Sequence, residues 1–324
     1  MSKDMMDRLN PELAGPVRMM LNMQGGGLNL DDIPSARAAG EQMKAAMKEQ
    51  MPVIEGVTTE DRQVPGPGGD PDVAIRIYRP SGNTGVLPAL LWIHGGGYIL
   101  GDIEQDDISA KELTLAGQCV TVSVEYRLAP ENPFPAPLED CYAALKWLSE
   151  NAAELDVDSK RIAIGGGSAG GGLAAGLALL ARDRAEVDII SQFLIYPMID
   201  DRNTLPASDV LPDSLFWTRE SNKIGWHSFL GCEPGGDNVS CYAAAARADD
   251  LAGLPPAYIA VGEIDLFAKE DIEYARRLIE AGVCTELHVY PGGCHAFDMM
   301  APDAAISRQF ADDFSRALKR ALHG

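Results

Sequence analysis

The sequence predicts an α/β fold in which a mostly parallel β-sheet is covered by helices on both faces. From about residue 73 onward, short apolar segments typical of strands alternate with longer helical segments, and this alternation is typical of parallel sheets. A chain of 324 residues with 46% hydrophobic content can also bury a large core. A glycine-rich stretch, residues 159–182, joins a predicted strand to a predicted helix through one sharp turn.

The composition excludes several classes of partner. A net charge of −21 repels phosphate, which argues against nucleic acid and anionic membranes. Asp4 and Asp7 lie near the amino terminus and no apolar segment follows them, so no signal peptide is expected. The longest apolar stretch, residues 173–181, is too short to span a bilayer. The six cysteines lack the paired spacing of a zinc site. We therefore expect a cytoplasmic protein whose thiols pack mainly as small hydrophobic groups.

Two helices are expected before any strand. Asn10 and Pro11 form a cap and first helical position for residues 11–23, and Pro34 begins a second helix over residues 34–50. Nine of the twelve methionines lie in the first 51 residues, with Met43 and Met47 one helical turn apart. Methionine at this spacing often fills a core, but it also forms adaptable apolar linings over binding sites.

The remaining elements follow from residue 57, where the sequence becomes rich in strand-forming residues. Besides a first strand from Val57, strands are expected at residues 73–78, 89–94, 120–125, 161–165, 189–196, 257–262 and 286–290. Helices are expected at residues 107–116, 138–151, 168–182, 269–281 and 303–322. Residues 201–247 interrupt this alternation, and their tryptophans and prolines suggest an inserted helical lid.

The turn at Ser168 is the central motif of the chain. Gly166-Gly167-Ser168-Ala169-Gly170 fits G-x-S-x-G, a strained strand-to-helix turn that exposes a serine hydroxyl at the top of a sheet. A glycine turn without catalytic function is the simplest alternative. Gly165, Gly167 and Gly170 also fit the dinucleotide pattern G-x-G-x-x-G, but the acidic residue that this pattern requires comes late, at Asp200 or Asp201. No Gly-Lys-Ser/Thr follows, which excludes a P-loop.

A second glycine motif follows the apolar strand at residues 89–93. His94-Gly95-Gly96-Gly97-Tyr98 presents consecutive backbone N–H groups, which is what stabilisation of a developing oxyanion requires. By itself the motif could be a tight loop with a buried structural histidine at position 94. Together with a later G-x-S-x-G turn, this position predicts the oxyanion loop of the same site.

The choice of a base and an acid for Ser168 follows by elimination. Of the five histidines, four lie in the glycine loop, an expected strand, the lid or the carboxyl terminus, and His295 alone follows the last strand in a loop. Asp265 follows the strand at residues 257–262, at the carboxyl end where open α/β sheets place their sites, and Glu263 is the alternative acid. The order Ser168, Asp265, His295 is the order that the G-x-S-x-G fold requires.

These motifs together resemble the bacterial hormone-sensitive lipase family (family IV) of α/β-hydrolases, from about residue 55 to the carboxyl terminus. The resemblance rests on residues 94–97, the segment Glu125-Tyr126-Arg127-Leu128-Ala129-Pro130-Glu131, residues 166–171, the Asp265 segment and residues 295–297. Two positions depart from the family pattern. Gly167 precedes the serine where the family usually has aspartate or threonine, and Leu266 replaces the proline that commonly follows the acid.

The resemblance implies an α/β-hydrolase fold with an eight-stranded sheet, and a carboxylesterase activity without metal or organic cofactor. It implies Ser168 as nucleophile, His295 as base, Asp265 as the acid that orients it, and the N–H groups of Gly95, Gly96 and Ala169 as oxyanion hole. The cap would comprise residues 1–50 and 202–246, and the catalytic core residues 51–201 and 247–324. A methionine-rich cap over the site would favour short acyl chains.

The resemblance also sets the expected partners and leaves alternatives open. The substrate is expected to be a small ester, with neither nucleic acid nor membrane as partner, and homodimers are common in the family. A hydrolase of amides or peptides would use the same residues. A ligand-binding member of the fold, like the plant gibberellin receptor, lacks the working histidine, so His295 argues against that alternative.

Overall fold

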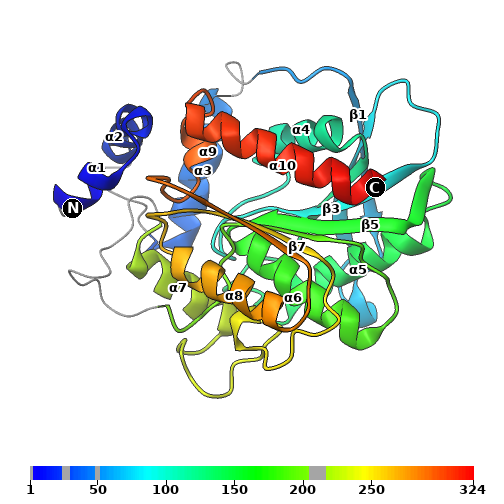
Figure 1. Ribbon diagram of the computed structural model, residues 1–324. Coiled ribbons are helices and arrows are strands. Elements are labelled where there is room, and N and C mark those ends of the chain that lie inside the picture. The colour runs from blue at the N-terminus through cyan, green and yellow to red at the C-terminus, as the bar shows by residue number, and fades with distance from the viewer. Residues whose placement is uncertain (1–2, 24–29, 48–51, 204–216) are drawn as a thin grey trace.

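The computed structural model describes residues 3–23, 30–47, 52–203 and 217–324, and one eight-stranded sheet runs through them (Figure 1). The strands are β1 (Val57–Val64), β2 (Val73–Pro80), β3 (Leu87–Ile93), β4 (Val120–Glu125), β5 (Val157–Gly167), β6 (Gln192–Ile195), β7 (Ala257–Gly262) and β8 (Thr285–Tyr290). Their order is β1-β2-β4-β3-β5-β6-β7-β8. Only the β1–β2 and β2–β4 pairs are antiparallel, which confirms the predicted mostly parallel, eight-stranded α/β-hydrolase sheet.

Helices cover both faces of the sheet. Figure 1 shows α4 (Asp107–Gly117) and α10 (Ala305–His323) on one face, and α5 (Ala136–Glu150), α6 (Ala169–Arg184) and α8 (Ala268–Glu280) on the other. Strand β3 serves both layers, because Leu90 and Trp92 pack in one apolar cluster while Leu91 and Ile93 pack in the other. Burial on both faces explains why this strand is continuously apolar.

The amino-terminal helices divide between two parts of the molecule. Helix α1 (Lys3–Arg8), which the sequence pattern did not predict, a 3-10 turn (Pro11–Leu13) and α2 (Ala14–Met23) bring Leu9 and Leu13 into the cluster of Tyr290 and Phe297. Helix α3 (Ile33–Met47) packs on the opposite cluster through Ile33. The end of the expected helix, at residues 48–50, lies outside the described residues.

Several predicted boundaries were wrong by a few residues. The strand expected at residues 189–196 is only Gln192–Ile195, because Tyr196 turns into the left-handed region at φ 37°. The strand expected at residues 161–165 extends over Val157–Gly167, since buried Val157 pairs with Leu87 ahead of an irregularity in the register and Gly166 pairs with Ile93. The helix after Ser168 begins at Ala169 because Ser168 itself has a positive φ.

The predicted helical insertion contains α7 (Arg219–Leu230) and a 3-10 turn (Ala245–Arg247), while residues 204–216 lie outside the described residues. A short helix, α9 (Phe297–Met300), directly follows His295. Of the six cysteines, Cys119, Cys141 and Cys294 are buried, so the expected packing as hydrophobic groups holds for half of them. Within the described part of the chain, no helix is both long and apolar enough to cross a membrane.

Candidate active site

Ser168 lies in the turn between β5 and α6, at the carboxyl end of a central strand. Its backbone has φ 56° and ψ −119°, a conformation that residues with side chains seldom adopt. The Ser168 N–H donates to the carbonyl of Ile195 at 2.9 Å, which fixes the turn to β6. A Cβ atom at Gly170 would lie 2.0 Å from the carbonyl oxygen of Ile93, so only glycine allows helix and strand to approach this closely.

The glycine before the turn is under the same constraint. A Cβ atom at Gly166 would lie 2.5 Å from the backbone of Gly170 and 2.6 Å from the Ile93 carbonyl. The G-x-S-x-G glycines are therefore required by close backbone contact between β3, β5 and α6. This contact holds the serine hydroxyl at the carboxyl end of the central strands.

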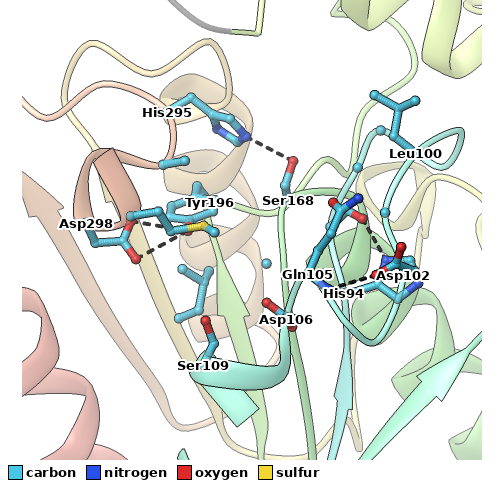
Figure 2. A pocket seen from close by; sticks show the side chains of 18 of the residues that line it. His94, Leu100, Asp102, Gln105, Asp106, Ser109, Ser168, Tyr196, His295 and Asp298 are labelled. Atoms are coloured by element: carbon cyan, nitrogen blue, oxygen red, sulfur yellow. Dashed lines mark hydrogen bonds between the residues drawn. The ribbon is translucent and has the colours of Figure 1, made fainter. Parts of the chain in front are cut away.

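His295 contacts both Ser168 and Asp265. It lies in the loop between β8 and α9, and its Nε2 is 3.0 Å from the Ser168 Oγ (Figure 2). Its Nδ1 is 2.8 Å from the Asp265 Oδ2, and the other oxygen of this carboxylate accepts a hydrogen bond from the Phe267 N–H at 3.0 Å. All three side chains are buried, with at most 9% exposure. The structure thus brings together the three residues that the chain order selected.

Glu263, the alternative acid, points elsewhere. One of its oxygens accepts a hydrogen bond from the Gly292 N–H at 3.0 Å, and the other lies 3.1 Å from an Nη atom of Arg8. The hydrogen bond from Gly292 and the charge of Arg8 lower the pKa of Glu263. This carboxylate therefore holds the loop three residues before His295 and does not contact the imidazole among the described hydrogen bonds.

The glycine loop after β3 lies against the Ser168 turn. A Cβ atom at Gly95 would lie 3.0 Å from the Gly167 carbonyl oxygen and 3.5 Å from the Ser168 Cβ. In the described part of the chain, the N–H groups of Gly95 and Gly96 donate to no acceptor. Ala169 is the first residue of α6, where a backbone N–H has no acceptor within its helix. Gly95 and Ala169 thus adjoin Ser168, and the Gly95 and Gly96 N–H groups donate to no acceptor among the described residues.

Gly96 and Gly97 give this loop its shape. Both have positive φ, and the Gly96 carbonyl accepts hydrogen bonds from the N–H groups of Ile99 and Leu100. A Cβ atom at Gly97 would lie 2.1 Å from the Trp217 ring. Trp217, from the segment before α7, therefore packs directly on the glycine loop.

His94 is buried and structural. Its ring stacks on Tyr126 with 4.2 Å between the ring centroids, and its Nδ1 is 2.8 Å from the Gly95 carbonyl oxygen. Burial lowers the pKa of His94 to about 4, so the ring is neutral and Nδ1–H donates to that carbonyl. The histidine therefore supports the glycine loop, and the described hydrogen bonds of its ring include none to Ser168.

A cavity of about 1170 Å³ adjoins Ser168 and His295. Its wall includes Ala36, Ala39 and Met43 of α3, together with Trp217 and Leu100. Residues of α4, α9 and α10 also line the cavity, and Figure 2 shows Asp106, Ser109 and Asp298 among the side chains around it. The cavity can therefore hold a small molecule with one of its groups against the serine hydroxyl.

Tyr196, Asp298 and Asp106 are among the cavity residues that the sequence analysis missed, whereas Trp217 lies in the segment that it predicted to be a lid. Burial raises the pKa values of Asp106 and Asp298 to about 6, and the charge of Asp298 adds to the rise at Asp106. Asp298 follows His295 by only three residues, and this short spacing could have indicated that Asp298 lies near the site. Nothing in the sequence indicated Tyr196 or Asp106, because their neighbours come from distant elements.

Leu266, where the family commonly has proline, is buried. Its carbonyl oxygen accepts a hydrogen bond from the Asn203 side chain at 3.0 Å. The loop around Asp265 is closed by the Asp265 N–H, which donates to the Gly262 carbonyl at 3.1 Å, and by the Ile264 N–H, which donates to the Gly293 carbonyl at 3.0 Å. These bonds give the loop a defined shape without proline.

Comparison with known proteins identifies the family to which this chain belongs. Residues 90–299 match the model of a family described as having the alpha/beta hydrolase fold. The chain is 36% identical over 304 residues to carboxylesterase NlhH of Mycobacterium tuberculosis, covering 90% of this chain and 91% of that protein. A bacterial heroin esterase structure is 41% identical with a TM-score of 0.91, covering 98% of this chain and 99% of that chain. The structure of esterase LipW from Mycobacterium marinum is 33% identical with a TM-score of 0.85, covering 98% of each chain. These matches extend over nearly the whole sequence and confirm the resemblance drawn from the motifs: the chain belongs to the hormone-sensitive lipase family of α/β-hydrolases, a family of carboxylic ester hydrolases.

Proposed function

We propose that this chain is a carboxylesterase of short-chain acyl esters, with Ser168 as nucleophile, His295 as general base and Asp265 as the acid that orients the base. The observation that carries the proposal is the pair of contacts made by one imidazole. Its Nε2 is 3.0 Å from the Ser168 Oγ and its Nδ1 is 2.8 Å from the Asp265 Oδ2. These distances allow the serine proton to move to the ring while the carboxylate holds the ring in place.

The proposed reaction begins with the Ser168 hydroxyl donating to His295 Nε2, while Nδ1–H donates to Asp265. As the serine oxygen attacks the ester carbonyl, the imidazole takes its proton, and the Asp265 carboxylate stabilises the resulting imidazolium. The alcohol then leaves with that proton, and the acyl group stays on Ser168. Water repeats the sequence, with His295 again as the base, and releases the carboxylic acid.

The charge that develops on the carbonyl oxygen would be met by the N–H groups of Gly95, Gly96 and Ala169. Two observations support this role: Gly95 lies against Ser168, and the N–H groups of Gly95 and Gly96 have no acceptor among the described residues. Donors fixed in the backbone need no reorganisation during the reaction, which makes them effective at stabilising an oxyanion. The proposed steps use only groups of this chain and require no metal or organic cofactor.

The preference for short acyl groups rests on the cap and on one relative. Helix α3 contributes Ala36, Ala39 and Met43 to the cavity wall, and Trp217 closes it beside the glycine loop. We therefore assign α3 within residues 1–50, and α7 with its preceding segment within residues 202–246, to the cap, and residues 51–201 and 247–324 to the catalytic core. A similar bacterial enzyme is a heroin esterase, and heroin carries acetyl esters.

Nitrophenyl esters from acetate to palmitate would test the acyl preference. We expect kcat/KM to rise over the first added methylenes, by roughly fourfold each at about 0.8 kcal/mol per methylene, and then to fall when the chain meets the wall. The intact protein should be used, because the Asn10 N–H donates to the Gly292 carbonyl at 3.0 Å and truncation would disturb the His295 loop.

Met43→Ala should move the best acyl length upward by removing part of the wall. Met19→Ala is the matched control, since this methionine is 67% exposed on α2 and does not line the cavity. Best turnover of palmitate, or an unchanged profile in Met43→Ala, would refute the proposed acyl preference. Faster cleavage of nitroanilides than of matched esters would instead indicate an amidase with the same catalytic residues.

A further inference from the structure

Tyr196 contacts both the Ser168 turn and the His295 ring. It follows β6, and its backbone adopts φ 37°, which is unusual for a residue with a large side chain. The ring meets the imidazole of His295 edge to face, with 4.9 Å between centroids and 68° between planes. The surrounding backbone therefore holds Tyr196 in an uncommon conformation that places its ring against the proposed base.

The tyrosine ring also lies against Gly167, the residue before the serine. A Cβ atom at Gly167 would lie 3.6 Å from the Tyr196 Cε2 and 4.0 Å from its hydroxyl oxygen. The tyrosine thus fills the space next to residue 167, where the sequence has no side chain. One buried side chain contacts both the turn of the proposed nucleophile and the ring of the proposed base.

The Tyr196 hydroxyl is held by Asp298. It donates to the Asp298 Oδ1 at 3.2 Å, as the dashed line in Figure 2 shows. Tyr196 is only 5% exposed, and a buried hydroxyl without a partner is unfavourable, so this hydrogen bond fixes the ring. Asp298 lies in α9, which begins two residues after His295. The bond therefore connects the end of β6 to the helix that directly follows the base.

The imidazole has a second aromatic neighbour. Phe267 meets it edge to face, with 5.2 Å between centroids and 86° between planes. Phe267 belongs to the Asp265 loop, since its N–H donates to the Asp265 carboxylate. One aromatic contact thus comes from the loop of the proposed acid and the other from the Tyr196–Asp298 pair.

We propose that Tyr196 and Asp298 are positioning residues for the reaction, because their hydrogen bond holds the His295 ring at its distance from the Ser168 hydroxyl. The inference rests on the proposed function, in which that distance governs proton transfer. Neither residue touches the reacting atoms in this role. Their loss should therefore lower kcat by a larger factor than it changes KM.

Three variants separate the hydrogen bond from the side chains that form it. Tyr196→Phe keeps the ring and removes the hydroxyl, and Asp298→Ala removes the acceptor. Asp298→Asn keeps an oxygen that can accept from the tyrosine. We expect kcat to fall roughly ten- to a hundredfold in the first two variants, the scale of a slightly misplaced catalytic group, and Asp298→Asn to restore most of it.

Tyr290→Phe is the matched control. Tyr290 is also a buried tyrosine, and its hydroxyl donates to an aspartate, Asp313 of α10, at 3.1 Å. It should lose stability like Tyr196→Phe but keep the wild-type kcat. The thermal midpoint of each variant should be measured with its kinetics. If Tyr196→Phe does not fold, the kcat values of Asp298→Ala and Asp298→Asn still test the role of the hydrogen bond. The Asp298 side chain lies at the cavity wall, so both of these variants are expected to fold.

The readouts are kcat and KM for a nitrophenyl ester and the rate at which a fluorophosphonate labels Ser168. A wild-type protein that hydrolyses no ester would reject the proposed function, and the labelling rates would then test the positioning role by themselves. An active wild type with equal kcat in Tyr196→Phe and Tyr290→Phe would overturn this inference alone. Equal losses in Asp298→Asn and Asp298→Ala would also overturn it, because they would assign the effect to charge.

Discussion

The Ser168 turn and the His295 loop are held in place by different means. The turn is fixed by backbone contacts, because glycines at positions 166 and 170 bring β3, β5 and α6 together and leave no room for a Cβ atom. The loop is held partly by backbone hydrogen bonds, from the N–H groups of Asn10 and Ile264 to the carbonyls of Gly292 and Gly293, and partly by side chains from distant parts of the chain. Glu263 binds the N–H of Gly292, and the ring of Tyr196 lies against His295.

This difference indicates how each part of the site responds to substitution. A turn built from close backbone contacts tolerates no added atom, so a substitution in the Ser168 turn affects the stability of the fold as well as the reaction rate. A loop held by several side-chain contacts loses them one at a time, so substitutions around His295 should give graded changes in rate. The variants below are ordered from the largest expected effect to the smallest.

Removal of the proposed nucleophile or base should have the largest effect. Ser168→Ala and His295→Ala should each lower kcat by roughly 10⁶-fold, because the groups act as a unit. The serine side chain is not what fixes the turn, so Ser168→Ala should keep the wild-type thermal midpoint, and both proteins should keep the wild-type circular dichroism spectrum. Near-normal turnover by either folded variant would reject the assignment.

Neutralising the proposed orienting acid should lower kcat by a smaller factor. Asp265→Asn should lower kcat by roughly 10⁴-fold, since an amide favours the wrong tautomer of the imidazole. Glu263→Gln should have a much smaller effect, because glutamine can still accept from the Gly292 N–H and loses only the half-exposed pair with Arg8. A larger loss of kcat in Glu263→Gln would transfer the role to that residue.

The parts of the site that could be predicted from the sequence are those defined by short motifs. The strand–turn–helix at Ser168 and the loop at residues 94–97 each place chemistry within a few residues, and the alternation of elements predicted the sheet. The sequence favoured Asp265 and kept Glu263 as the alternative, because both follow β7 and the direction of each side chain depends on the loop. Here Phe267 N–H and His295 meet Asp265, whereas Gly292 and Arg8 meet Glu263.

The contacts that could not be predicted join residues far apart in the chain. Tyr196 and Asp298 are 102 positions apart, and their pairing depends on the turn of the backbone after β6. The sequence pattern placed Tyr196 at the end of a regular strand, where its side chain would have had a different direction. Long-range side-chain packing of this kind leaves no periodic signal in a sequence.

Adding a methyl group to the Ser168 turn tests the role of the backbone. In Gly170→Ala the new Cβ would lie 2.0 Å from the Ile93 carbonyl oxygen, and since backbone must move, we expect a loss of at least about 3 kcal/mol in the free energy of unfolding. Gly15→Ala is the control, because nothing lies within 4 Å of a Cβ at this position in α2. It should stabilise the protein slightly, since alanine favours a helix. Equal denaturation midpoints for the two variants would contradict the close-packed turn.

The smallest expected effect concerns Asp106, which lies on the cavity wall beside Asp298. Burial is the main cause that raises the pKa of Asp106 from 3.8 to about 6. Between pH 4 and 6 the folded protein therefore keeps a proton that the unfolded chain loses, and the free energy of unfolding falls as pH rises through this range. The full shift corresponds to about 3 kcal/mol, which is an upper limit because the carboxyl borders the cavity.

Asp106→Asn should accordingly stabilise the protein at pH 7.5 by about 1 to 2 kcal/mol, and the gain should shrink as the pH is lowered towards 4.5. The amide oxygen can still accept the hydrogen bond that the Trp92 Nε1–H gives to Asp106 Oδ2 at 2.5 Å. Asp107→Asn is the neighbouring control with the opposite expected sign, because Asp107 pairs with Arg76 at 3.3 Å and with Lys111 at 2.6 Å. Urea denaturation of both variants across this pH range would measure the effect. A gain in Asp106→Asn that stayed constant with pH would show that its origin is not the ionisation of this carboxyl group, and the cavity wall beside His295 would then not carry the unfavourable charge that we assign to it.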